Sequence, residues 1–154
     1  MAVEYFTKWV EAEAVATITE SRVRTFIWKN IICRFGLPRI LVSDNGAQFS
    51  GHRLKEWLAS FKIEQRFTSV GYPQANGQAE STNKTVVKIL EKRLRTSQES
   101  WADDLEGVLW AHRTTARTAT KETPFSLVYG SEAVIPSEIA VETLRIREFE
   151  DKAN

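Results

Sequence analysis

Residues 39–46, Arg39-Ile40-Leu41-Val42-Ser43-Asp44-Asn45-Gly46, are the stretch that decides the fold class. The apolar run is too short for a helix and is bounded by polar and turn-forming residues. It therefore predicts a buried strand of the kind found in parallel sheets. Asp44-Asn45-Gly46 predicts a turn at the carboxyl end of that strand, which is where open α/β sheets place their ligands.

Helical and strand patterns alternate on both sides of this strand. Upstream, Thr17-Ile18-Thr19-Glu20 is a capping-box pattern for a helix whose apolar stripe runs to Phe35 and which Gly36 and Pro38 end. The other expected elements are a hairpin of two strands within 2–15 that turns at Thr7-Lys8, a helix over 51–61, a strand over 63–68, a helix over 78–95, a helix capped by Ser100, and a short helix from Thr123-Pro124. Alternation of this kind predicts an α/β fold.

The composition is that of one globular domain. The chain has 154 residues, of which 42% are hydrophobic and 27% are charged. Its apolar runs fall far short of the ~20 residues that cross a bilayer. The single cysteine, Cys33, cannot form an internal disulfide, which favours the cytoplasm or nucleus. Because the net charge is only +1, any nucleic-acid binding would depend on cations gathered on one face.

Two carboxylates stand out as candidate metal ligands. Asp44 follows the buried strand, and Glu80 is expected in the first turn of the long helix, after a turn-rich segment over 69–78 that predicts a mobile loop. Oxygen ligands held by rigid elements suit a hard cation such as Mg²⁺. The alternatives are that Asp44 caps its own turn and that Glu80 complements the helix dipole.

The long helix has two distinct faces when residues are placed at about 100° intervals. One face is charged and the opposite face is apolar: the first carries Glu80, Lys84, Lys88, Glu91 and Arg95, and the second carries Val86, Ile89, Leu90 and Leu94. The charged face suits a metal beside a track of phosphates, but an ordinary solvated face with a Glu80–Lys84 pair explains it equally well.

Four motifs give these residues a family context. Residues 42–49 (VSDNGAQF) and 72–84 (YPQANGQAESTNK), with 35 residues between Asp44 and Glu80, resemble the integrase catalytic core of retroviruses and LTR retrotransposons and its D,D-35-E signature. Residues 5–9 (YFTKW) and 123–130 (TPFSLVYG) resemble the Gypsy-type branch.

The resemblance implies a function and a set of site residues. It implies an RNase H-like mixed sheet flanked by helices, with residues 1–130 as the core and 131–154 as an extension or the start of a linker. It implies 3′-end processing and strand transfer on double-stranded DNA, catalysed with two Mg²⁺ or Mn²⁺ ions. It also implies a homo-oligomer that binds neither a membrane nor a small-molecule substrate. Asn45, Gly46 and Gln48 would shape the turn that presents Asp44. Asp44 and Glu80 would be catalytic metal ligands, and the DNA-binding residues would be Tyr72, Gln74, Asn76, Gln78, Asn83, Lys84 and Lys88.

One departure from the family pattern bears on activity. The first catalytic Asp of the family lies on a strand upstream of the one that contains Val3 to Phe6, and Glu4 matches a position that is not catalytic. We therefore expect a core fragment without its first central strand, marginally stable and inactive alone. A non-catalytic DNA- or protein-binding module derived from a transposable element is the alternative, and another RNase H-like nuclease fits the 35-residue spacing less well. His112 is expected to be a satisfied core histidine, and His52 to lie near a helix start.

Overall fold

A computed structural model describes residues 1–68, 74–94, 101–118 and 120–134. For residues 74–76, 78–80, 93 and 94 it describes the backbone alone. In chain order the elements are β1 (Ala2–Val3), β2 (Val10–Glu11), α1 (Glu20–Phe26), the π-helical η1 (Ile27–Ile32), α2 (Cys33–Phe35), β3 (Ile40–Ser43), α3 (Ala47–Ser50), α4 (His52–Ser60), β4 (Glu64–Phe67), α5 (Gln74–Leu94), α6 (Trp101–Arg113) and α7 (Pro124–Tyr129). The alternation of strands and helices confirms the predicted α/β class.

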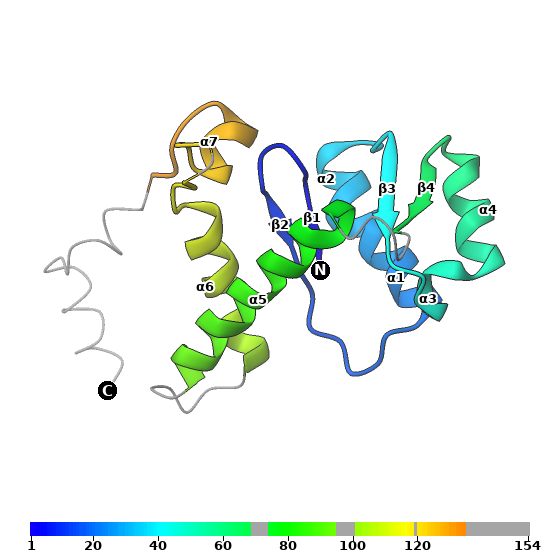
Figure 1. Cartoon of the computed structure of the whole chain (residues 1–154), viewed down its shortest axis with the longest axis horizontal. Coiled ribbons are helices and arrows are strands. Elements are labelled where there is room, and N and C mark those ends of the chain that lie inside the picture. Colours follow the sequence, from blue (N-terminus) through cyan, green and yellow to red (C-terminus); the bar gives the residue numbers. More distant parts are fainter. Residues whose placement is uncertain (69–73, 95–100, 119, 135–154) are drawn as a thin grey trace, which may run out of the picture.

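The strands form two separate pairs. β1 and β2 are antiparallel, with Val3 opposite Val10, whereas β3 and β4 are parallel, from Ile40 opposite Glu64 to Ser43 opposite Phe67. Within the described residues each sheet has only these two strands, and Figure 1 shows them apart. The prediction of a parallel strand at 39–43 is therefore confirmed.

The prediction that this strand is buried is wrong for most of its length. Only Ser43 is buried, Ile40 and Leu41 are half-buried, and Val42 is 45% exposed. β3 has a strand partner on one edge alone in the described part of the chain, so the sheet cannot enclose it. A four-residue strand of this kind leaves backbone groups on its other edge for a further partner.

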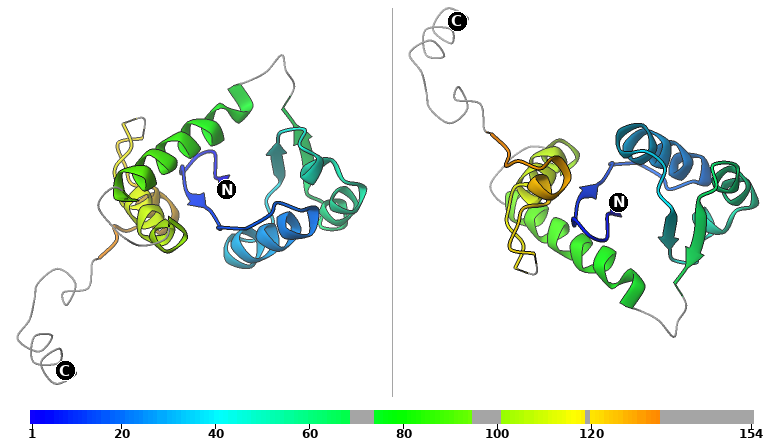
Figure 2. Two further views of the ribbon diagram at one scale, coloured as in Figure 1. Left: turned by 90° about the horizontal axis from the view of Figure 1, so that it is seen from below. Right: turned by 90° about the horizontal axis from the view of Figure 1, so that it is seen from above.

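Two clusters of buried side chains form the core. The first, here called the hairpin core, joins β2 to α5 and α6, and the second, the sheet core, joins α1 and η1 to α4 and the start of β4. Figure 2 shows the corresponding halves of the molecule from below and from above. The hairpin core contains Val10, Val86, Leu90, Leu105, Val108 and Leu109, and the sheet core contains Val23, Ile27, Leu54, Leu58 and Ile63.

Polar and aromatic contacts join the two halves. The Glu11 carboxylate on β2 lies 2.7 Å from an Arg34 nitrogen on α2, and the Trp9 and Phe35 rings meet edge to face at 6.0 Å. Asn30 also donates a hydrogen bond to Glu13 at 3.3 Å. Helix α5, which belongs to the hairpin core, reaches across to contact β3.

Local signals located the helix ends more accurately than the helix interiors. The hydroxyl of Thr123 accepts from the Ser126 amide, so this predicted helix start is confirmed. The capping box over 17–20 places the N-cap of the first helix at Thr17, whereas the observed N-cap is Thr19, whose hydroxyl accepts from the Arg22 amide. Gly36 ends α2 with a φ of +87°, which glycine adopts without strain. The predicted single helix over 20–35 instead contains the wider turn of η1 between α1 and α2.

Two other predictions need correction. The hairpin is shorter than expected, because residues 4–9 form a loop between β1 and β2 in which Lys8 has a φ of +63°. The helix expected from residue 78 begins at Gln74, so 74–78 is not a mobile loop. The predicted segment 131–154 lies outside the described residues beyond residue 134. None of the described helices has the length and apolar character to cross a membrane.

Candidate functional site

Asp44 is held at the carboxyl end of β3 by its own turn. Its Oδ1 accepts a hydrogen bond from the Gly46 amide at 2.9 Å, and the residue is exposed. The next side chain, Asn45, donates to the carbonyl of Thr68 at 3.4 Å and so joins the turn to the end of β4. Asp44 thus caps its turn, as the structural alternative predicted, and at the same time presents a carboxylate to solvent.

Gly46 allows the turn to close on this carboxylate. A Cβ at position 46 would lie 2.9 Å from Asp44 Oδ1 and 2.8 Å from the side-chain carbonyl carbon of Gln48. Such a contact would displace one of the two side chains. The turn geometry therefore agrees with the role that the family resemblance gave to Gly46 and Gln48.

Glu80 lies further along its helix than the sequence predicted. Because α5 begins at Gln74, Glu80 is in the second turn rather than the first. The helix dipole acts within the first turn, so complementing the dipole no longer explains this residue. The Glu80 side chain is not among those the structure describes, but α5 contacts β3, and its amino-terminal end lies near the end of that strand in Figures 1 and 2.

The other predicted site residues divide into two groups. Tyr72 lies outside the described residues, and Gln74, Asn76 and Gln78 are on the backbone of α5, where their side chains are not described. Asn83, Lys84 and Lys88 are exposed on α5. The turn-forming residues of 69–78 predict a loop there, because Asn and Gly are poor helix formers, but the helix in the structure already includes Gln74, Asn76 and Gln78.

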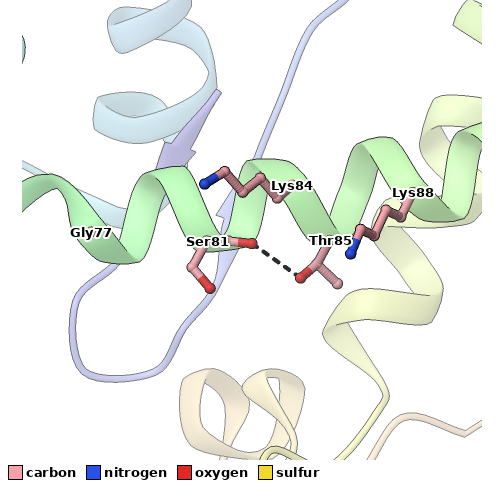
Figure 3. A pocket seen from close by; sticks show the side chains of 5 residues that line it. All are labelled: Gly77, Ser81, Lys84, Thr85 and Lys88. Atoms are coloured by element: carbon pink, nitrogen blue, oxygen red, sulfur yellow. Dashed lines mark hydrogen bonds between the residues drawn. The ribbon is translucent and has the colours of Figure 1, made fainter.

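Lys84 and Lys88 line a shallow hollow on α5. Its volume is about 320 Å³, and its other lining residues are Gly77, Ser81 and Thr85 (Figure 3). The Thr85 hydroxyl donates to the Ser81 carbonyl at 3.0 Å, which keeps that side chain against the helix. Val86 and Leu90 are buried in the hairpin core, so these residues confirm the predicted division of the helix into charged and apolar faces.

Glu4 is occupied within its own loop. Its Oε2 accepts hydrogen bonds from the Thr7 amide and hydroxyl, both at 2.6 Å. Partial burial raises the pKa of Glu4, but hydrogen bonds from Thr7, Phe6 and Tyr5 outweigh it and leave the pKa below its usual value. Among the side chains that the structure describes, no three His, Cys, Asp or Glu residues are grouped to hold a metal.

Neither histidine is placed as a metal ligand, although one is unusual. His52 is the first residue of α4 and lies 3.2 Å from Glu56. His112 is buried as predicted, but its Nδ1 has no hydrogen-bond partner in the described part of the chain, so the expectation of a satisfied histidine is wrong. Burial, followed by the positive charges of Arg117 and Arg113, lowers the pKa of His112 to about 4.

The sequence did not predict the buried ionic cluster that surrounds Glu11 in the structure. Arg113 donates to the Val10 carbonyl at 3.0 and 2.8 Å and to Glu11 at 2.9 Å, and its guanidinium lies 4.6 Å from the Trp9 ring centroid. The Trp9 indole also donates to Glu11, at 2.8 Å. The alternation over 8–15 places positions 9 and 11 on the same side of a strand, but nothing local in the sequence pairs them with a residue about a hundred positions away.

Comparison in sequence connects this arrangement to known proteins. Residues 1–73 match the family model of the integrase core domain. The chain is 31% identical over 134 residues to the Transposon Tf2-3 and Tf2-4 polyproteins of Schizosaccharomyces pombe. This alignment covers 86% of the chain but only 10% of each polyprotein.

Comparison of structures identifies the fold. The HTLV-2 integrase catalytic core in complex with magnesium (trimeric form) superimposes with a TM-score of 0.68 at 19% identity, over 80% of this chain and 79% of that one. The simian T-cell lymphotropic virus intasome in complex with PP2A regulatory subunit B56 gamma superimposes with a TM-score of 0.75 at 21% sequence identity, and the match covers 87% of this chain and 48% of that one. The catalytic core domain of BIV integrase superimposes with a TM-score of 0.68 at 23% identity, covering 81% of this chain and 80% of that one. The chain thus has the RNase H-like fold of the retroviral integrase catalytic cores, and its sequence similarities support a place in the integrase superfamily.

Proposed function

We propose that this chain is a fragment of the catalytic core of a Gypsy-type retrotransposon integrase, an enzyme whose complete core trims the 3′ ends of the element's double-stranded DNA and joins them to target DNA. The observation that carries the proposal is the placement of Asp44. It is exposed at the carboxyl end of β3, and the helix that bears Glu80, separated from Asp44 by 35 residues, contacts that strand. We also propose a homo-oligomer acting in the nucleus or cytoplasm, on the strength of the resemblance.

The donor set at this position fits a hard divalent cation. Asp44 offers a carboxylate that the Gly46 amide orients, and carboxylate oxygens are what Mg²⁺ and Mn²⁺ prefer. Such cations, held by Asp44 and Glu80, would activate the attacking oxygen and stabilise the leaving one. The exposed cations Lys84 and Lys88, with Asn83 beside them, would hold DNA phosphates near these carboxylates.

We further propose that the polypeptide of residues 1–154 binds DNA but does not catalyse strand transfer by itself. Two carboxylates are few for a pair of cations, and Glu4 is committed to hydrogen bonds in the β1–β2 loop. Among the described residues β3 has a strand partner on one edge alone, so its other edge could accept a further strand that supplies another acid. DNA binding without transfer is also what a non-catalytic binding module would show.

Titration with Mn²⁺, followed by NMR, tests the metal site directly. Because Mn²⁺ is paramagnetic, we expect selective broadening of the amide signals of residues 44–46 and of the α5 turn around Glu80, reversed by excess Mg²⁺. Asp44→Asn should abolish the broadening, whereas Asp103→Asn, a change at an exposed carboxylate on α6, should leave it intact. Broadening centred elsewhere, or unchanged by Asp44→Asn, would remove Asp44 from the site and leave DNA binding alone as the function.

A further inference from the structure

The basic residues of the chain are concentrated in one segment. Residues 20–68 contain nine Lys and Arg residues and four Asp and Glu residues, a net charge of +5 in a chain whose total is +1. All nine cations are exposed. Two of the four acids have cationic or histidine partners, since Glu64 pairs with Arg66 at 2.7 Å and Glu56 with His52. This half of the molecule therefore presents an excess of positive charge to solvent.

Two of these arginines come from different helices and meet at one hollow. Arg24 on α1 and Arg53 on α4 line a depression of about 180 Å³, together with Glu20 and Ser21. Within the described residues neither arginine forms an ion pair with a carboxylate. The hollow shares no lining residue with the one on α5, and Figure 1 shows α1 and α4 on the opposite side of the molecule from α6 and α7.

Glu20 lines the same hollow but forms no ion pair with either arginine in the described part of the chain. Its carboxylate lies against the backbone of Gly51, in the space that a Cβ at that position would fill. Gly51 is the N-cap residue just before α4, and it has no side chain to cap the first amides of the helix. A carboxylate at that place is stabilised by the partial positive charge of the helix end. The charge of Glu20 is thus directed at α4, and the guanidinium groups remain available.

We propose that Arg24 and Arg53 bind the phosphate backbone of double-stranded DNA at a second contact site, separate from α5. The inference rests on the proposed function, because it names a further surface for the same DNA. Guanidinium groups bind phosphate oxygens through paired hydrogen bonds, and two arginines from two helices can grip one phosphate or two neighbouring ones. The Ser21 hydroxyl, in the same hollow, is a further donor.

The salt dependence of DNA binding tests this site. Fluorescence anisotropy with a labelled duplex, between 50 and 300 mM salt, gives the slope of log K against log salt, which changes by about 0.9 for each phosphate that the protein no longer neutralises. We expect the Arg24→Ala/Arg53→Ala variant to reduce the slope by about one if the two arginines share a phosphate, and by about two if they bind neighbouring phosphates. The control is Arg22→Ala/Lys55→Ala, which removes the same amount of positive charge from the same two helices. Arg22 and Lys55 lie about 200° around their helix axes from Arg24 and Arg53, so this variant should keep a slope near that of the unchanged chain.

The possible results separate this inference from the proposed function. If the Arg24/Arg53 variant and the control have the same slope, the second site is overturned. If the unchanged chain binds duplex DNA without salt dependence, and Lys84→Ala/Lys88→Ala has no effect either, the proposed function itself fails. Arg24→Lys/Arg53→Lys should keep most of the slope but weaken binding, because the charge remains while the paired hydrogen bonds are removed. Equal affinity in that variant would contradict guanidinium recognition.

Discussion

Replacing Glu11 by Gln should destabilise the protein by about 3 kcal/mol, near the lower end of the range for breaking a buried ion pair. The Glu11 side chain is 6% exposed and that of its partner Arg113 is 10% exposed, so the change leaves a guanidinium buried without a compensating charge. The cost stays near the lower end because Arg113 keeps its hydrogen bonds to the Val10 carbonyl. The amide oxygen of Gln can also still accept from the Trp9 indole.

Urea unfolding followed by tryptophan fluorescence measures this cost, and Trp9 lies directly beside the substituted group. The matched control is Arg34→Ala, which breaks the second ion pair of Glu11. Because the Arg34 side chain is 41% exposed, solvent screens that pair and its removal should cost about 1 kcal/mol or less. If Glu11→Gln costs under 1 kcal/mol, or if Arg34→Ala costs as much, then burial does not set the energy of this cluster.

Three other predictions follow from single positions. Gly46→Ala should weaken Mn²⁺ binding, because the added Cβ crowds both Gln48 and the Asp44 carboxylate and disturbs the turn, and an unchanged affinity by NMR titration would mean that the turn does not orient Asp44. The free energy of unfolding should fall as the pH drops from about 6.5 to about 4, because His112 takes up a proton in the unfolded chain but not in the folded one. The loss is about 3 kcal/mol at most. Urea titrations at each pH measure it, and it should be absent from the His112→Asn variant. Glu80→Gln, in a chain extended by an amino-terminal strand that ends in Asp, should abolish strand transfer without changing Tm, and retained transfer would exclude Glu80 from the mechanism.

The sequence predicted those features that depend on short-range patterns. The run Ile40 to Ser43 predicted a strand of the parallel type, Thr123 predicted the start of α7, and the capping box over 17–20 placed the start of α1 within two residues. Each of these follows from a few neighbouring side chains whose preferences act locally.

Features that depend on long-range packing could not be predicted in this way. The exposure of Val42 depends on how many strands flank β3, and the start of α5 at Gln74 contradicts the weak helix preference of Asn76 and Gly77. The pairing of Glu11 with Arg113 joins positions about a hundred residues apart. At the candidate site, the sequence therefore located Asp44 well but placed Glu80 in the wrong turn of its helix.

The position of the candidate site relative to the two cores has a consequence for its assembly. Asp44 ends β3, which packs with the sheet core, whereas Glu80 lies on α5, whose buried face belongs to the hairpin core. The separation of the two carboxylates therefore depends on the contacts between the halves, among them α5 with β3 and Glu11 with Arg34. A ligand that both carboxylates bind favours the arrangement in which the halves are together, and by mass action it stabilises that arrangement. The assembly of the site and the stability of the fold are thus coupled through the same contacts.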